Sequence, residues 1–311
     1  MIEGLPDFLV VGAAKSGTTS LYYYLKEHPS IYLSHIKEVW FFSFKDNPPQ
    51  DGGPASLGEM IITNSDEYRK LFVDAKPNQL GGDICPSYLY THLATVKNIK
   101  EVYGSYHKKL KIIICLRNPI DRAYSQYMMF KRDNNEPLSF EKALKPEIIQ
   151  ERLNNGWNFF YDYISFGMYY QQVITFLQEF PNTKVVLFDD FVRSPDSILM
   201  ELMGFLEIEK TYLDAARDFR YNVSGIPKYR KLDYFVSEAN LLKSLLKPVM
   251  NKMMSKDARY KLKNLIRNTY IVKPSMKRET RNRLISIYKE DISRLQSLLG
   301  RDLSNWTSME S

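Results

Sequence analysis

Cysteine and histidine are scarce in this sequence. Of its 311 residues, only Cys85 and Cys115 are cysteines, and four are histidines. Two cysteines without CxxC spacing are too few for a disulfide framework, and the histidines form no cluster with metal-ligand spacing. The sequence therefore predicts neither a disulfide scaffold nor a structural metal.

Long apolar runs are also missing. No stretch approaches the roughly 20 residues that span a bilayer, and core-type residues begin at Phe8, which leaves no room for a signal peptide. We therefore expect a cytoplasmic protein. Hydrophobic residues make up 44% of the chain and aromatic residues 14%, which is ample material for a globular core.

The net positive charge of the chain comes from one region. Residues 221–283 contain sixteen Lys and Arg against four Asp and Glu, whereas the whole chain carries only +7. Such a region can face nucleic acid, an anionic membrane or a polyanionic ligand, or be a solvated helical surface. Within it, residues 241–254 have the spacing of a basic amphipathic helix that serves as a lid, as packing or as a membrane contact.

The most informative stretch begins at residue 8. Residues 8–11 are apolar and β-prone, Gly12 and Gly17 bracket a turn, and Leu21 with Leu25 begins an apolar stripe at helical spacing. A strand, a turn and a helix in this order bring backbone amides and the positive end of a helix dipole together. This unit predicts an anion site that suits a phosphate.

The lysine of this unit is displaced from the nucleotide-binding template G-x-x-x-x-G-K-[ST]. Thr18 stands where the template has lysine, Thr19 follows, and the lysine is Lys15. A kinase or ATPase needs its lysine on the β and γ phosphates and a metal held by the Ser/Thr and a distant Asp. The displacement favours another donor. A P-loop kinase or NTPase, and a turn without any ligand, stay open as alternatives.

A second strand, turn and helix unit follows at residues 110–125. Its strand is almost continuously apolar, and Pro119 begins the helix. Arg117 leaves the strand end and Ser125 lies about two helical turns further on, so a guanidinium and a hydroxyl could hold one phosphate. The alternative is that Arg117 pairs structurally with an aspartate.

Two carboxylates are candidate general bases. Glu38 precedes an aromatic run at 40–42, within a stretch, residues 37–42, that we expect to be extended. Asp83 lies where a predicted strand runs out into a turn. A general base must lie near the acceptor and have its pKa raised by apolar surroundings. A surface role beside a buried strand for Glu38, and a turn role for Asp83, are the alternatives.

The order of elements predicts the fold class. Strands and helices alternate up to about residue 210, which indicates an α/β fold with a P-loop-like, doubly wound, mostly parallel sheet and helices on both faces. We expect one domain over residues 1–311, with an α/β core at about 1–210 and a basic, mainly helical part at about 211–311. In open sheets of this kind, the ligand crevice lies outside the carboxyl ends of the strands.

Together these blocks resemble sulfotransferases that use 3′-phosphoadenylyl sulfate (PAPS), in the bacterial branch related to the heparan sulfate O-sulfotransferases. The resemblance rests on the loop at 12–19, the pair Lys37 and Glu38 before aromatic residues, Arg117 with Ser125, and the ending at 288–306. It implies transfer of a sulfuryl group from PAPS to a hydroxyl, with 3′-phosphoadenosine 5′-phosphate (PAP) as the other product and no metal.

The resemblance also implies roles for individual residues. Glu38 matches the catalytic glutamate, Lys15 would stabilise charge, and Asp83 is the rival base. Residues 225–231 would replace the nucleotide loop of the animal enzymes. The nucleotide-binding residues are expected to be Lys15, Ser16, Gly17, Thr18, Thr19, Arg117, Ser125, Lys228 and Arg230.

One departure from the heparan-type pattern bears on the acceptor. Those proteins have Glu-Lys before Thr/Ser-Pro, whereas this chain has Asp83 and Ile84 before Cys85, so an acceptor-side lysine is missing. We expect an alcohol of a small-molecule metabolite or a carbohydrate, no nucleic acid and no membrane contact. The alternative is a basic membrane- or nucleic-acid-binding module, whose affinity would fall steeply with salt.

Overall fold

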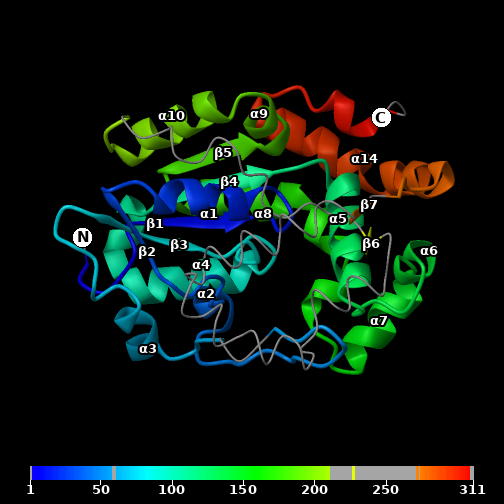
Figure 1. Cartoon of the computed structure of the whole chain (residues 1–311), viewed down its shortest axis with the longest axis horizontal. Helices are drawn as coiled ribbons and strands as arrows, with labels where there is room; N and C mark the ends of the chain where they lie inside the picture. Colours follow the sequence, from blue (N-terminus) through cyan, green and yellow to red (C-terminus); the bar gives the residue numbers. More distant parts are fainter. Residues whose placement is uncertain (1, 58–60, 211–225, 228–270, 273, 309–311) are drawn as a thin grey trace, which may run out of the picture.

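A five-stranded parallel sheet forms the centre of the computed structural model, which describes residues 2–57, 61–210, 226–227, 271–272 and 274–308. The strand order is β2-β3-β1-β4-β5 (Figure 1). Since all pairs are parallel, the carboxyl ends of the five strands meet at one edge. The strands are β1 (Phe8–Gly12), β2 (Ile31–Leu33), β3 (Leu80–Ile84), β4 (Lys111–Leu116) and β5 (Thr183–Leu187).

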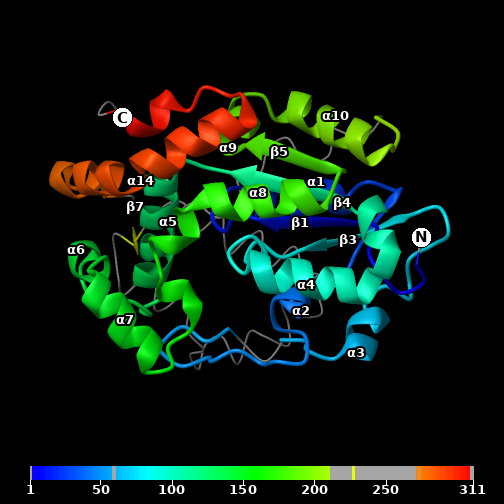
Figure 2. The same cartoon turned by 180° about the vertical axis from the view of Figure 1, so that it is seen from behind.

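Helices cover both faces of this sheet (Figures 1 and 2). Leu9 and Val11 of β1 belong to a buried cluster with α4 and α8, while Phe8 and Val10 belong to a second cluster with α1 and α10. Alternate residues of one strand thus enter opposite layers, which confirms the predicted doubly wound sheet. The helices are α1 (Thr18–Lys26), α2 (Phe41–Phe44), α3 (Ser65–Lys70), α4 (His92–Tyr103), α5 (Pro119–Arg132), α6 (Phe140–Ala143), α7 (Pro146–Asn154), α8 (Tyr169–Glu179), α9 (Phe188–Arg193), α10 (Pro195–Leu206) and α14 (Arg278–Leu299).

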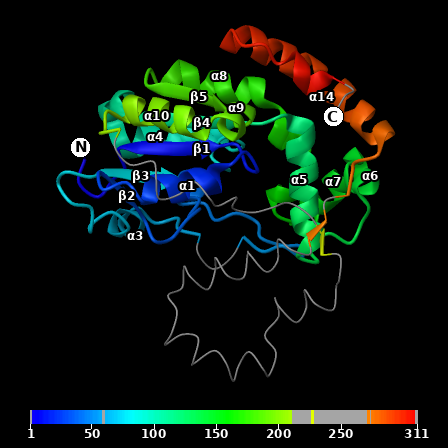
Figure 3. The same cartoon turned by 45° about the horizontal axis from the view of Figure 1, so that its top comes forward.

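The C-terminal helix α14 packs against two other helices. It contacts both α8 and α5 (Figure 3). Beyond it, the Asn118 side chain donates a hydrogen bond of 3.2 Å to the carbonyl oxygen of Trp306. Asn118 is also the N-cap of α5, where its side chain accepts from the backbone of Ile120. The end of the chain therefore stabilises the turn that carries Arg117.

The prediction of an extended segment at residues 37–42 is wrong. Glu38 and Trp40 have left-handed φ angles of 61° and 52°, and the aromatic run enters the short helix α2. Successive side chains of a strand point to opposite faces. Here Phe41 stacks on Tyr68 at 4.1 Å, and Phe42 packs edge-on against the same ring. One helical turn lets both rings enter a single core.

Part of the basic region lies outside the described residues. This applies to Lys228, Arg230 and the helix predicted at 241–254. Of the remainder, β6 (Ile226–Pro227) pairs antiparallel with β7 (Ile271–Val272). In the part of the chain that the structure describes, no helix combines the length and apolar character needed to cross a membrane.

Candidate active site

The turn between β1 and α1 leaves a helix N-terminus open. Gly17 is the N-cap of α1 with φ 85°, and a Cβ there would lie 3.0 Å from the ring of Phe188, so this position suits glycine. Among the described residues, no side chain caps α1, and its first turn contains no acidic residue. The backbone amides and the dipole at this end of α1 therefore favour an anion.

The side chain of Lys15 is buried near two arginines. Its ammonium is 3.3 Å from the sulfur of Met129, which is only a weak acceptor. Burial lowers the pKa of Lys15 to about 8; the charges of Arg132 and Arg117 add to this shift, and those of Glu38 and Asp133 oppose it. A cation held this way is stabilised when an anion binds beside it.

Arg117 is fixed from two sides at the end of β4. Its guanidinium donates to the carbonyl oxygen of Lys15 at 3.0 Å and lies 4.7 Å from the ring centre of Phe188. Within the described part of the chain no carboxylate forms an ion pair with Arg117. The charge of Asp121 acts on Arg117, but its ion pair, at 2.6 Å, is with Arg281. Ser125, the other residue of this predicted phosphate site, is buried on α5.

Two buried hydroxyl groups lie beside these cations. The hydroxyl of Tyr169 interacts with the side chain of Ser16 and with the backbone of Arg117. Burial raises the pKa of Tyr169 to about 12, against opposing effects of Arg122, Ser16 and Arg117. Both hydroxyls are hydrogen-bond donors at the site that favours an anion.

Glu38 is held close to the same loop. Its Oε1 accepts an ion-paired hydrogen bond of 2.8 Å from the ammonium of Lys37, which also donates to Thr19 Oγ1 at 2.9 Å. The backbone at Glu38 adopts the left-handed region, a conformation that costs free energy for a side chain of this kind. The base candidate thus lies next to the first turn of α1.

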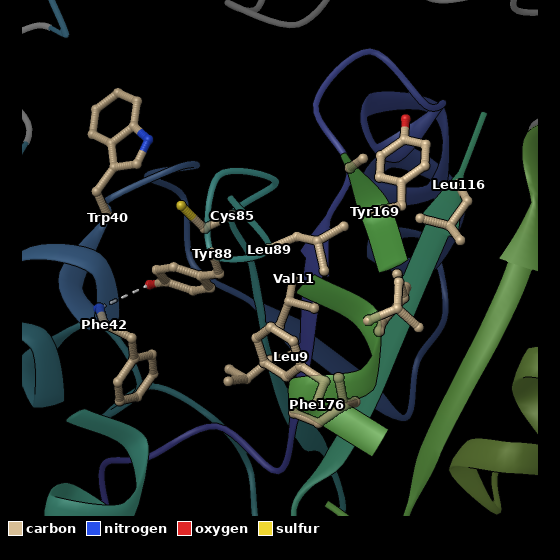
Figure 4. Packing of buried hydrophobic residues seen from close by; sticks show 14 of the residues in the cluster. Leu9, Val11, Trp40, Phe42, Cys85, Tyr88, Leu89, Leu116, Tyr169 and Phe176 are labelled. Atoms are coloured by element: carbon tan, nitrogen blue, oxygen red, sulfur yellow. Dashed lines mark hydrogen bonds between the residues drawn. The ribbon is translucent and has the colours of Figure 1, made fainter. Parts of the chain in front are cut away.

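Asp83 is buried at the end of β3. Its Oδ2 accepts hydrogen bonds of 2.8 Å from both Tyr68 and Tyr88. The Tyr88 hydroxyl in turn accepts from the backbone nitrogen of Phe42 (Figure 4). Burial raises the pKa of Asp83 to about 6, the two phenols oppose this shift, and the charge of Glu38 adds to it.

The parallel sheet therefore gathers most of the predicted site. Lys15, Glu38, Asp83 and Arg117 follow or end four different strands, and their carboxyl ends share one edge. Electrostatic effects of Glu38 reach both Lys15 and Asp83. Lys228 and Arg230 lie outside the described residues. Sequence reasoning missed Arg132 and Tyr169, for which no local pattern gave a signal, and the contact of Lys37 with Thr19.

Asp83→Leu is expected to lower the free energy of unfolding by about 2 to 6 kcal/mol, because it leaves two buried phenols without an acceptor at about 1 to 3 kcal/mol each. Asp83→Asn keeps an acceptor oxygen and is the matched control. Urea unfolding at pH 7.5 measures both variants. Equal stability of Asp83→Leu and the wild type would contradict the role of this carboxylate as an acceptor for the phenols.

The raised pKa of Asp83 also predicts a pH effect on stability. The folded protein keeps this carboxyl protonated up to about pH 6, whereas the unfolded chain ionises it around the ordinary aspartate value of 3.8. The folded state therefore binds more protons between these values, and this group's contribution to stability falls as pH rises through that window. Asp83→Asn should lack that part of the pH dependence in urea unfolding from pH 4 to 7.

This chain is similar to known sulfotransferases in sequence and in fold. The model of the sulfotransferase domain family matches residues 5–296. The crystal structure of a sulfotransferase from Alicyclobacillus acidocaldarius superposes with a TM-score of 0.73 at 28% identity, covering 98% of this chain and 99% of that one.

Curated relatives are larger proteins. Membrane-associated sulfotransferase kil1 of Dictyostelium discoideum is 34% identical over 46% of this chain and 28% of its own length. Human bifunctional heparan sulfate N-deacetylase/N-sulfotransferase 3 is 25% identical over 99% of this chain and 32% of its own length. Human heparan sulfate glucosamine 3-O-sulfotransferase 5 is 25% identical over 72% of this chain and 62% of its own length. The chain thus spans less than two thirds of each of these relatives.

Proposed function

Because this chain belongs to the sulfotransferase domain family, we propose that it transfers a sulfuryl group from PAPS to a hydroxyl of a carbohydrate or small-molecule metabolite and releases PAP. One observation carries the proposal. Lys15, with its pKa lowered to about 8, lies beside Arg117 and Arg132 at the uncapped N-terminus of α1. A nucleotide with several phosphates brings negative charge to these three cations.

The two phosphate ends of the nucleotide are assigned to two elements. The turn before α1 would hold the 5′-phosphosulfate through its amides and hydroxyls. The start of α5 would hold the 3′-phosphate, with the Arg117 guanidinium as the charged donor. The full proposed set is Lys15, Ser16, Gly17, Thr18, Thr19, Arg117, Ser125, Lys228 and Arg230, to which the hydroxyl of Tyr169, beside Ser16 and Arg117, adds a further candidate.

The proposed chemistry needs a base and neutralisation of the leaving group. A bond forms between the acceptor oxygen and sulfur while the bond from sulfur to the phosphate oxygen breaks, and its electron pair stays on the phosphate. Lys15 and the amides at the start of α1 stabilise that charge. Glu38 takes the proton of the hydroxyl. Asp83 is the rival base, although its Oδ2 already accepts from two phenols.

A screen of acceptors tests the proposal. The purified chain is incubated with PAPS and a panel containing heparan sulfate, N-acetylglucosamine, glucosamine, an aliphatic alcohol and a phenol, and PAP release is followed. Mass spectrometry of the products separates O-sulfation from N-sulfation, since glucosamine offers an amine that N-acetylglucosamine lacks. A protein that neither binds PAP nor releases it from PAPS would refute the proposal.

Turnover is expected to persist in excess EDTA, because Lys15 and the helix N-terminus perform the neutralisation that Mg²⁺ performs in a kinase. The measurement is PAP release with EDTA and with added Mg²⁺. Activity that EDTA abolishes and Mg²⁺ restores would favour the kinase or NTPase alternative.

PAP binding is expected to take up protons at alkaline pH. At pH 8.5 the free Lys15 is mostly neutral, since its pKa is lowered to about 8, and the bound phosphate favours the charged form. We expect uptake of about 0.5 to 1 proton per PAP at pH 8.5 and almost none at pH 7. Calorimetry in buffers of different ionisation enthalpy measures the uptake.

The matched variants are Lys15→Met and Lys70→Met, the latter at the exposed end of α3. Lys15→Met should abolish the proton uptake and weaken PAP, whereas Lys70→Met should change neither. Uptake that survives in Lys15→Met would assign the titrating group elsewhere.

A further inference from the structure

Lys37 connects the base candidate to the nucleotide loop. Its ammonium lies 2.8 Å from Glu38 Oε1 and 2.9 Å from Thr19 Oγ1, so one cation bridges two elements that are separate in the sequence. Both ends of the ion pair are largely shielded, with exposed side-chain fractions of 22% for Lys37 and 33% for Glu38. A bridge of this kind can fix the direction of a carboxylate.

The backbone around Glu38 is arranged to present its side chain. Residues with left-handed φ angles, Glu38 and Trp40, flank the buried Val39. The carbonyl oxygen of Val39 accepts a hydrogen bond of 3.0 Å from the backbone of Ile62, which anchors the segment. Strained backbone held by its surroundings is typical of functional sites. The backbone hydrogen bond of Val39 does not orient the Glu38 side chain. The ion pair with Lys37 does.

The orientation of Lys37 is also restricted. An ammonium has three donors, and Glu38 and Thr19 use two of them. The ring of Tyr22 on α1 lies 5.8 Å from the ammonium, within reach of a cation–π interaction. Contacts with Thr19 and Tyr22 thus tie Lys37 to α1, the helix whose N-terminus is the proposed phosphate site.

We propose that Lys37 is a positioning residue that holds the Glu38 carboxylate toward the first turn of α1, where the sulfuryl group would be transferred. This inference rests on the proposed function and extends it. In this arrangement Lys37 contributes through Glu38, so its removal lowers the rate of proton transfer and leaves the nucleotide contacts of α1 in place. Productive alignment of the acceptor, the base and the transferred group is the source of this contribution.

The test is a double-mutant cycle with Lys37→Met, Glu38→Gln and the combined variant, together with Lys37→Arg. Radiolabelled PAPS is the donor and water the acceptor, so sulfate release under single-turnover conditions measures the rate without knowledge of the natural acceptor. PAP affinity is measured by calorimetry for each variant. A coupling between the two positions appears as non-additive rate losses.

We expect Lys37→Met to slow sulfate release at least tenfold, with PAP affinity within threefold of the wild type. Lys37→Arg keeps a cation, so its sulfate release should be at least threefold faster than that of Lys37→Met. In the Glu38→Gln background, Lys37→Met should change the rate less than threefold, because no base remains to be positioned.

Three results would overturn the inference. An equal loss in both backgrounds would show that Lys37 acts directly on the transferred group, and a parallel tenfold loss of PAP affinity would make it a nucleotide contact. A Lys37→Met protein with the wild-type rate would remove any role. By contrast, a wild-type protein that does not bind PAP would refute the proposed function, and this inference with it.

Discussion

Glu38→Gln is expected to lower the single-turnover rate by about 10²- to 10⁴-fold, which is the usual contribution of general base catalysis. The amide is nearly isosteric with the carboxylate but cannot accept the proton of the acceptor. PAP affinity should stay almost unchanged, since Glu38 is not among the proposed nucleotide contacts. The rate is measured with PAPS and the best acceptor of the panel, under conditions in which product release cannot mask the chemical step.

Two variants make this prediction specific. Glu27→Gln alters an exposed glutamate at the end of α1 and should keep the wild-type rate. Asp83→Asn tests the rival base, which has one oxygen bound to two phenols. Near-full turnover of Glu38→Gln together with a large loss in Asp83→Asn would transfer the role of base to Asp83.

Arg117→Ala is expected to weaken the binding of PAP by roughly 2 to 5 kcal/mol while the fold is retained, because truncation removes the proposed charge-assisted contact of a partly buried guanidinium with the 3′-phosphate. ADP has no 3′-phosphate, so its affinity should change little. In the wild type, PAP should therefore raise the melting temperature far more than ADP does. In Arg117→Ala, the two nucleotides should give similar shifts.

The matched control is Arg283→Ala, at an exposed position of α14. It removes the same charge at a distance from the turn that follows β4, and it should leave the preference for PAP over ADP intact. Equal melting shifts by PAP and ADP in the wild type, or unchanged PAP affinity in Arg117→Ala, would remove Arg117 from the nucleotide site.

Local sequence predicted the elements that carry the site. The strand, turn and helix around residues 8–26 follow from an apolar run, Gly12 and Gly17, and helical spacing, all within a few residues of one another. Pro119 lies at the first helical position of α5, where its missing amide hydrogen costs nothing. Helix α10 (Pro195–Leu206) buries Leu199, Leu202, Met203 and Leu206, which recur at helical spacing.

The aromatic run after Glu38 was predicted wrongly for a physical reason. Aromatic residues favour strands on average, but packing against a specific partner overrides that preference. Phe41 and Phe42 both pack on Tyr68, which is far from them in the sequence. No pattern within residues 37–42 contains that information.

The sequence by itself determined the parallel α/β class, the open N-terminus of α1 and the candidates Lys15, Glu38 and Arg117, because spacing, turn residues and helix starts depend on near neighbours. Tertiary structure alone decided how the candidates are held. The hydrogen bonds from Lys37 to Thr19, from Tyr68 to Asp83 and from Arg117 to Lys15 join residues 18, 15 and 102 positions apart. Such contacts form only when parallel strands bring their carboxyl ends to one edge, and burial at that edge then shifts the pKa values of Lys15 and Asp83.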